Sequence, residues 1–216
     1  MAFHGFGPDA VEFFVELGAH NDRPWWTSQR ERYRTSVADP LAALADELVD
    51  EFGPVHVFRP NRDVRFSADK RPYKEQAAFV AGHGDGQPGG GSLYLQLSAD
   101  GLALGGGWWT PGAAQLAAFR TAVDDPAVAA DLQALLAELA RTGLELDPGD
   151  PVATAPRGWS REHPQIALLR RRRLAVLHAL EPGPWLATDE VVDVVRRDWR
   201  LTQRFVGWLQ EHAAAD

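Results

Sequence analysis

The feature that most restricts the fold of this chain is a stretch of alternating leucines near its middle. Leu93, Leu95 and Leu97 occupy every second position, and a period of two residues is typical of a strand with one buried face. An Asp100-Gly101 pair follows, and a second apolar run covers 102–109. Because an Asp-Gly pair between two such runs favours a tight turn, the sequence predicts an antiparallel hairpin here.

Helical patterns lie on both sides of this hairpin. Capping residues and apolar residues spaced three or four apart predict helices over 9–19, from 22 onwards, and over 40–52, 110–124, 125–142, 164–180 and 188–212. Helices grouped before and after a block of strands are typical of α+β proteins. We therefore predict an α+β fold with an antiparallel sheet of about four to six strands, flanked by N-terminal and C-terminal helices. A single domain is expected over 1–216.

The remaining stretches are less regular. The glycine-rich segment 82–91 and the segment 143–163, rich in proline and glycine, are predicted to be loops. After the third helix, a β-rich stretch is expected to lead into and through the basic segment, with Val55, Val57, Val64 and Phe66 as its strand-like residues. In the first helix, the predicted packing stripe consists of Val11, Phe14, Val15 and Leu17.

Composition limits the class of protein. The chain has 216 residues, 45% hydrophobic and 24% charged, which is ordinary for a globular protein with a sizeable core. It has no cysteine, so disulfides, thiolate metal sites and cysteine nucleophiles are excluded. Its seven histidines are scattered, and no metal site is predicted. Because no signal peptide is visible and no apolar run approaches about 18 residues, we expect a cytoplasmic protein without a membrane partner.

The most concentrated chemistry lies in the segment 59–74. It holds six cationic and two anionic side chains, a local charge of six minus two, or +4, in a chain whose formal net charge is −8. Arginine presents paired donors that match phosphate and carboxylate oxygens, and a bound anion offsets the repulsion within a cationic cluster. The sequence therefore predicts a site for an anionic ligand, with contacts from Arg59, Arg62, Arg65, Ser67, Asp69, Lys70 and Lys74.

Three side chains are candidates for proton chemistry at this site. Asp63, which with Asp69 could orient the cations, and Tyr73 lie within the segment, and His163 is a residue type suited to general acid–base catalysis. The candidate catalytic residues are therefore Asp63, Tyr73 and His163. For His163, which precedes Pro164, the alternative is a role as a loop anchor. The sequence leaves open whether a reaction is catalysed, and it identifies no cofactor.

Residues elsewhere in the chain are predicted to complete the site. Trp108 and Trp159 could form a pocket wall or stack on a base, the alternative being that they fill the core. In the helix predicted over 164–180, Arg170 and Arg173 fall inside the apolar stripe. A guanidinium among leucines is rarely left unpaired, so Arg170 is a candidate ligand contact. Pairing with acidic side chains of a neighbouring helix is the alternative.

Several distinct motifs are spread along nearly the whole chain. The longest covers 62–74 with the letters RDVRFSADKRPYK. The others are Phe3-His4-Gly5-Phe6, Asn21-Asp22-Arg23, Trp25-Trp26, Gly105-Gly106-Gly107-Trp108, Pro156-Arg157-Gly158-Trp159 and His163-Pro164. With these motifs the chain resembles the bacterial and fungal family catalogued as domain of unknown function 2461. It departs from the family pattern at Asp22, where a second asparagine is expected, and at Trp26, where phenylalanine is expected. The resemblance implies one fold unit and brings no activity.

Three hypotheses of function follow. The first is a basic pocket that binds a small ligand bearing a phosphate or carboxylate, with or without catalysis. The second is an interaction module for an acidic protein segment or single-stranded nucleic acid, and the third is a purely structural network of ion pairs.

Duplex DNA is not expected, because positive charge is confined to 59–74 and 170–173. The Gly105–Gly107 run predicts a bulge or close packing, with a pocket wall as the alternative, rather than a nucleotide loop, since Lys-Ser or Lys-Thr does not follow it. The oligomeric state is not predicted.

Overall fold

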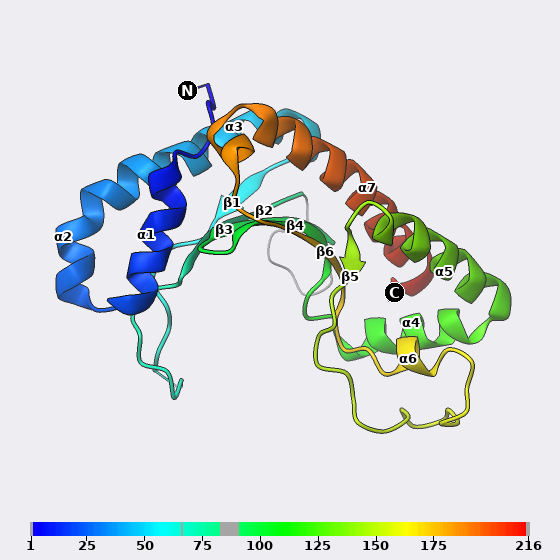
Figure 1. Cartoon of the computed structure of the whole chain (residues 1–216). Helices are drawn as coiled ribbons and strands as arrows, with labels where there is room; N and C mark the ends of the chain where they lie inside the picture. The colour runs from blue at the N-terminus through cyan, green and yellow to red at the C-terminus, as the bar shows by residue number, and fades with distance from the viewer. Residues whose placement is uncertain (1, 66, 83–90, 215–216) are drawn as a thin grey trace. The chain divides into compact units, whose positions relative to one another are not determined.

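The computed structural model describes residues 2–65, 67–82 and 91–214, which form an α+β fold on a six-stranded antiparallel sheet (Figure 1). The strands lie in the order β1-β2-β3-β4-β6-β5. The predicted fold class and the central hairpin are confirmed. The strand bounds are β1 (Val55–Val57), β2 (Gln76–Ala81), β3 (Ser92–Ser98), β4 (Gly101–Trp108), β5 (Glu145–Leu146) and β6 (Leu174–Leu180).

Six of the seven predicted helices are present, and two of them begin at a capping side chain that the sequence indicated. The side chain of Asp22 accepts a hydrogen bond from the backbone N–H of Trp25 at 2.8 Å, and Asp125 accepts one from Ala127 at 2.8 Å. Each acid thereby satisfies a donor that a helix start leaves open. The helices are α1 (Pro8–Ala19), α2 (Arg23–Tyr33), the π-helical turn η1 (Arg34–Ala38), α3 (Asp39–Phe52), α4 (Ala113–Asp124), α5 (Pro126–Ala140), α6 (Ile166–Leu169), the 3₁₀ turn η2 (Pro184–Ala187) and α7 (Glu190–Ala213).

The chain divides into two compact units, each assembled from three segments. The first unit comprises Met1–Ala81, Tyr94–Leu104 and Ala179–Arg197. The second unit comprises Gly82–Leu93, Gly105–His178 and Asp198–Asp216. The expectation of a single domain stays a prediction, and each unit is described by itself.

The core of the first unit is rich in aromatic rings. Phe13 is fully buried and packs against the rings of Trp25, Trp26 and Tyr33, with centroids 5.4–5.8 Å away. The predicted stripe of α1 was therefore partly wrong, because Val15 is 51% exposed. The aromatic side chains of α2 select the face of α1 that carries Phe13, which the spacing of apolar residues in α1 alone does not reveal.

The core of the second unit gathers α4, α5, α6 and the end of α7 around parts of β4 and β6. Figure 1 shows α4 and α5 (green) beside the end of α7 (red). The largest side chains in this core are Trp108, Phe119, Phe205 and Trp208. Trp108, a predicted pocket wall, thus lies 2% exposed in a packed core.

The helix predicted over 164–180 was wrong. Only Ile166–Leu169 is helical, and Leu174–Leu180 is strand β6, which pairs with β5 through Glu145 opposite Leu177 and Leu146 opposite Val176. A short apolar run such as 174–177 fits a buried strand as well as a helix, so its periodicity does not decide between them. Pairing with β4 and β5 decides here. The stripe on which Arg170 and Arg173 were placed therefore does not exist.

Two strands were also missed, and the predicted β-rich stretch does not extend to Val64. The predictions did not include β2 or the two-residue strand β5, and Val64 lies outside any strand. The predictions for Phe66 and for most of the loop 82–91 fall outside the described residues. In the part of the chain that the structure describes, no helix combines the length and apolar character needed to cross a membrane.

The Gly105–Gly107 run confirms the prediction of close packing. A Cβ atom on Gly105 would lie 1.9 Å from the carbonyl oxygen of Val176, and one on Gly107 would lie 2.3 Å from that of Leu174. A Cβ atom on Gly106 would lie 2.4 Å from the carbonyl oxygen of Ser92. These are main-chain atoms that cannot turn away, so only glycine permits strand β4 to approach its neighbours this closely.

Substitution of Gly105 should therefore destabilise the protein. We expect Gly105→Ala to lower the free energy of unfolding by about 1–3 kcal/mol, the usual cost of overpacking. The matched control is Gly207→Ala in α7, where a Cβ atom would meet nothing within 4 Å and where alanine should stabilise the helix by up to about 1 kcal/mol. Urea unfolding followed by circular dichroism measures both. Wild-type stability of Gly105→Ala would contradict the packing argument.

Candidate functional site

The predicted anion site lies on a long hairpin between β1 and β2 in the first unit. The backbone N–H of Arg62 donates to the Pro72 carbonyl at 2.9 Å, and that of Lys74 donates to the Pro60 carbonyl at 2.8 Å. An isolated bridge pairs Asn61 with Tyr73. Figure 1 shows this segment, in cyan to teal, as a narrow loop projecting beyond the ends of α1 and α2.

The base of the hairpin is anchored through Tyr73. The Asn21 side chain donates to the Tyr73 carbonyl at 3.0 Å and accepts from its backbone N–H at 3.1 Å. The Tyr73 ring stacks on Trp26 with centroids 4.0 Å apart, and it is buried. The motif residues Asn21, Trp26 and Tyr73 therefore join the hairpin to α2. Tyr73, a candidate catalytic residue, therefore packs at the base of the hairpin rather than lying at its tip.

Two Asp-x-Arg units repeat the same geometry on the hairpin. Asp63 accepts from the backbone N–H of Arg65 at 3.2 Å and from its Nε and Nη2 at 3.0 and 2.7 Å. Asp69 accepts from the same three donors of Arg71 at 3.0, 3.1 and 2.7 Å. Each aspartate thus holds both the turn and the guanidinium two residues later. Both aspartates orient cations as predicted, but they also neutralise them.

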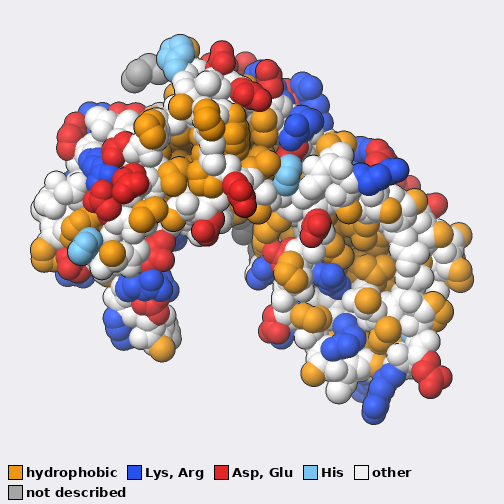
Figure 2. Space-filling view, viewed as in Figure 1, with side chains coloured by type: hydrophobic (Ala, Val, Ile, Leu, Met, Phe, Trp, Pro, Cys, Tyr) orange, Lys and Arg blue, Asp and Glu red, His pale blue; other side chains and the backbone are white. Residues whose placement is uncertain are grey.

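Further ion pairs close the hairpin on itself. Arg62 donates to Asp69 at 2.6 Å, and Arg71 also pairs with Glu75. Hydrogen bonds from the side chain of Arg71, then from its backbone, and then from Arg62 hold the pKa of Asp69 well below its ordinary range. Figure 2 shows blue and red side chains next to one another along this projection. The arrangement agrees with the structural hypothesis for Arg62, Arg65 and Arg71.

The other cations of the hairpin have different surroundings. Lys70 donates to the carbonyl of Val64 at 3.1 Å. The Lys74 ammonium lies 5.1 Å from the centre of the Phe58 ring, and burial, together with the charge of Arg59, lowers the pKa of Lys74. The positive charge of Arg59 thus acts on Lys74, and it also helps to lower the pKa of Asp63. Ser67 is half-buried, and its backbone N–H donates to the Val64 carbonyl at 3.4 Å.

The remaining predicted site residues belong to the second unit. Trp159 Nε1 and His163 Nε2 both reach Asp124 Oδ1, at 3.2 and 2.9 Å, while Nδ1 of His163 accepts from the backbone N–H of Gln165 at 3.0 Å. Since Nδ1 is an acceptor, this network assigns the proton to Nε2. Both imidazole nitrogens are thus engaged. The contacts fasten the loop before α6 to the end of α4, the anchoring role that was the alternative for His163.

The run Arg170–Arg173 also faces a single loop, 147–152, in the second unit. Arg170 Nε donates to the Val152 carbonyl at 2.6 Å, and Arg171 donates to the Asp147 carbonyl. A guanidinium nitrogen of Arg172 lies 3.6 Å from Asp150, and one of Arg173 lies 3.1 Å from Asp147. The four arginines therefore clamp this loop, and Arg170 has a main-chain partner in place of the predicted helix stripe.

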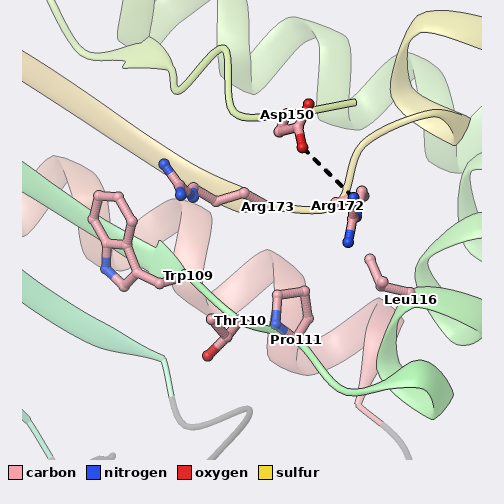
Figure 3. Close-up of a pocket in the computed structure, with 7 residues that line it drawn as sticks. All are labelled: Trp109, Thr110, Pro111, Leu116, Asp150, Arg172 and Arg173. Carbon is pink, nitrogen blue, oxygen red and sulfur yellow. Dashed lines mark ion pairs between the residues drawn. The ribbon is translucent and has the colours of Figure 1, made fainter. Parts of the chain in front are cut away.

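A pocket of about 340 Å³ opens beside this clamp (Figure 3). Its residues come from the end of β4 and the start of α4 on one side and from the arginine run and its loop on the other. Figure 3 shows Arg173 extending toward the Trp109 indole, with Arg172 near Pro111 and Leu116. The lining residues are Trp109, Thr110, Pro111, Leu116, Asp150, Arg172 and Arg173.

The two arginines of the pocket differ in how firmly they are held. Arg173 lies over the Trp109 ring, 5.4 Å from its centroid, and pairs with the buried Asp147. The Arg172–Asp150 separation of 3.6 Å exceeds hydrogen-bond length, and these side chains are 60% and 93% exposed. An exposed pair of this kind contributes little stability. Arg172 is therefore the cation that a ligand can engage at small cost.

Arg172 and Asp150 were not predicted to belong to any site. The charge of the run 170–173 marks Arg172 as part of a cationic cluster, whereas Asp150 lies in a predicted loop and gives no such signal. The contact of His178 Nδ1 with Oδ2 of the buried Asp198, 2.7 Å apart, was not predicted either. Among the described residues, no group of three or more His, Asp or Glu side chains is arranged to hold a metal ion.

The pairing within the hairpin gives a test by pH titration. The carboxyl carbon of Asp69, followed by NMR, should titrate well below 3.8. Because the folded pKa is lowered, the ordering contributed by Asp69 is present above its unfolded pKa and is lost as the pH falls through the folded value.

Two variants separate the contributions to this pKa. Arg71→Gln should raise the pKa of Asp69 more than Arg62→Gln does, because Arg71 supplies the larger contacts. The pKa of Asp63, which is lowered chiefly by Arg65, is the internal control and should stay unchanged. An Asp69 titration that is indifferent to Arg71→Gln would refute the pairing.

Comparison with known proteins identifies the family. The family model described as conserved hypothetical protein (DUF2461) matches residues 9–208, a range that includes the hairpin and the pocket. Searches of curated proteins and of solved structures returned no match. The chain therefore belongs to the DUF2461 family, as its motifs predicted.

Proposed function

We propose that the second unit binds a small molecule bearing a carboxylate or phosphate in the pocket beside the arginine clamp. The observation that carries this proposal is the state of Arg172, an exposed guanidinium on the pocket wall with only a 3.6 Å contact to Asp150. Arginine offers paired donors to either anion. A ligand that accepts from Arg172 gains a charge-assisted contact without breaking a strong one.

The walls of the pocket favour a ligand with an apolar part. Trp109, Pro111 and Leu116 are half-buried and line the pocket. Binding sites for small molecules are typically cavities of about 300–1,000 Å³ with apolar walls and a few polar groups that fix orientation. The pocket volume of about 340 Å³ lies at the lower end of that range. It suits one small molecule better than a polymer.

Rigid surroundings support this location. Arg173 is held by Asp147 and by the Trp109 ring, and the backbone N–H of Gly149 donates to Asp147 at 2.7 Å. One wall of the pocket is thus fixed before a ligand arrives, which reduces the entropy lost on binding. The exposed pair of Arg172 and Asp150 is the part of the lining whose side chains would adjust.

The hairpin of the first unit supports a second candidate, the interaction with an acidic protein segment or single-stranded nucleic acid. The Lys74 ammonium favours it, because this cation lies over the Phe58 ring, where burial and the charge of Arg59 lower its pKa, and a bound anion would offset its charge. Most hairpin arginines already have acidic partners, including Asp63 and Asp69. We therefore favour the pocket.

Binding of matched aromatic probes tests the proposed function. We expect 3-phenylpropionate to bind, and its uncharged amide, 3-phenylpropanamide, to bind about tenfold more weakly, because one exposed charge-assisted contact is lost. Arg172→Gln should weaken the acid by a similar factor and leave the amide unchanged. Isothermal titration calorimetry on the full chain measures all four affinities.

The control is Arg161→Gln, which removes the same charge from an exposed residue that does not line the pocket. Its affinity for the acid should equal that of the wild type. Equal binding of acid and amide, or an acid affinity that survives Arg172→Gln, would count against the proposal.

A further inference from the structure

The pocket carries a carboxylate as well as a cation on its accessible wall. Asp150 faces Arg172 across 3.6 Å, and both belong to the lining. From this pairing we infer that the ligand is a zwitterion, a free α-amino acid with an apolar side chain. The inference rests on the proposed function and specifies its ligand.

Charge balance distinguishes a zwitterion from a simple anion. An anion at Arg172 lies close to Asp150, and two negative charges at such short range repel each other. A ligand that carries an ammonium next to its carboxylate gives each side chain an opposite charge. The Arg172–Asp150 pair is thereby replaced by two new pairs, and no charge in the pocket is left without a partner.

The geometry of the pair permits this exchange. The distance of 3.6 Å is too long for a hydrogen bond, and the Asp150 side chain is 93% exposed. Both side chains can therefore part without burying an unpaired charge. Arg173 does not take part in the exchange, because Asp147 and Trp109 already hold it.

The size and walls of the pocket select the rest of the ligand. Pro111, Leu116 and the Trp109 ring offer apolar surface next to the charged pair, so an apolar side chain gains by leaving water. The volume of about 340 Å³ fits one amino acid rather than a peptide. Within a peptide chain, moreover, the two charges lie at opposite ends, whereas only the free amino acid carries both on one carbon.

Three ligands with the same ring test the inference on the full chain. They are L-phenylalanine, 3-phenylpropionate, which lacks the ammonium, and phenethylamine, which lacks the carboxylate. We expect L-phenylalanine to bind about two- to fivefold tighter than 3-phenylpropionate, as one additional exposed charge pair allows. Phenethylamine should bind more weakly than L-phenylalanine by at least the same factor.

Asp150→Asn isolates the carboxylate. In this variant L-phenylalanine and 3-phenylpropionate should bind with about equal affinity. The affinity for 3-phenylpropionate should equal or exceed that of the wild type, because the repulsive charge of Asp150 is gone. Glu162→Gln, which removes an exposed acid that does not line the pocket, is the control and should retain the preference. A thermal melt establishes that each variant is folded.

The outcomes separate the two proposals. If 3-phenylpropionate binds the wild type as tightly as L-phenylalanine does, the zwitterion is refuted and the anion pocket stands. If none of the three ligands binds, both proposals fail. Should Asp150→Asn not fold, the comparison of the three ligands on the wild type still decides the inference.

Discussion

The close approach of β4 to β6 is the constraint on which the candidate site depends. Gly105 and Gly107 leave no room for a Cβ atom against the carbonyl oxygens of β6. Since β6 begins immediately after Arg173, and Trp109 lies two residues beyond Gly107, this approach brings the guanidinium over the indole at the end of the two strands. The glycine run thus positions the pocket without touching a ligand. A bulkier strand would separate the two walls.

Positive charge alone does not identify a binding site in this protein. The hairpin carries six cations, but Asp63, Asp69 and Glu75 satisfy three of its arginines. The arginine run has only four cations, and three of them are held by the loop 147–152 through carbonyl oxygens or a buried carboxylate. What distinguishes Arg172 is a long, exposed contact next to apolar walls. The strength of the existing partners therefore indicates where an anion can bind, since displacing a good pair costs what the new pair gains.

Local signals in the sequence were sufficient for much of the fold and for little of the site. The caps at Asp22 and Asp125 and the alternation before Asp100-Gly101 each depend on neighbouring residues, and each was predicted correctly. Strand β6 was not predicted correctly, because its apolar residues fit both the helical and the strand period. Only its pairing with strands distant in sequence distinguishes the two. Arg172 was consequently assigned to the wrong kind of element, and its partner Asp150 lay in a predicted loop without any pattern. Contacts between distant segments are the information that spacing along a chain does not contain.

The pocket and the hairpin place different demands on specificity. A ligand of the hairpin must compete with acids that lie two, four or seven residues from the arginines they hold, so those acids are always present at high effective concentration. At the pocket, Asp150 and Arg172 hold each other weakly, and each remains available to a partner that satisfies both at once. Such a pair disfavours a lone anion through Asp150 and a lone cation through Arg172. Discrimination by repulsion of the wrong ligand is therefore built from the same two side chains that attract the right one.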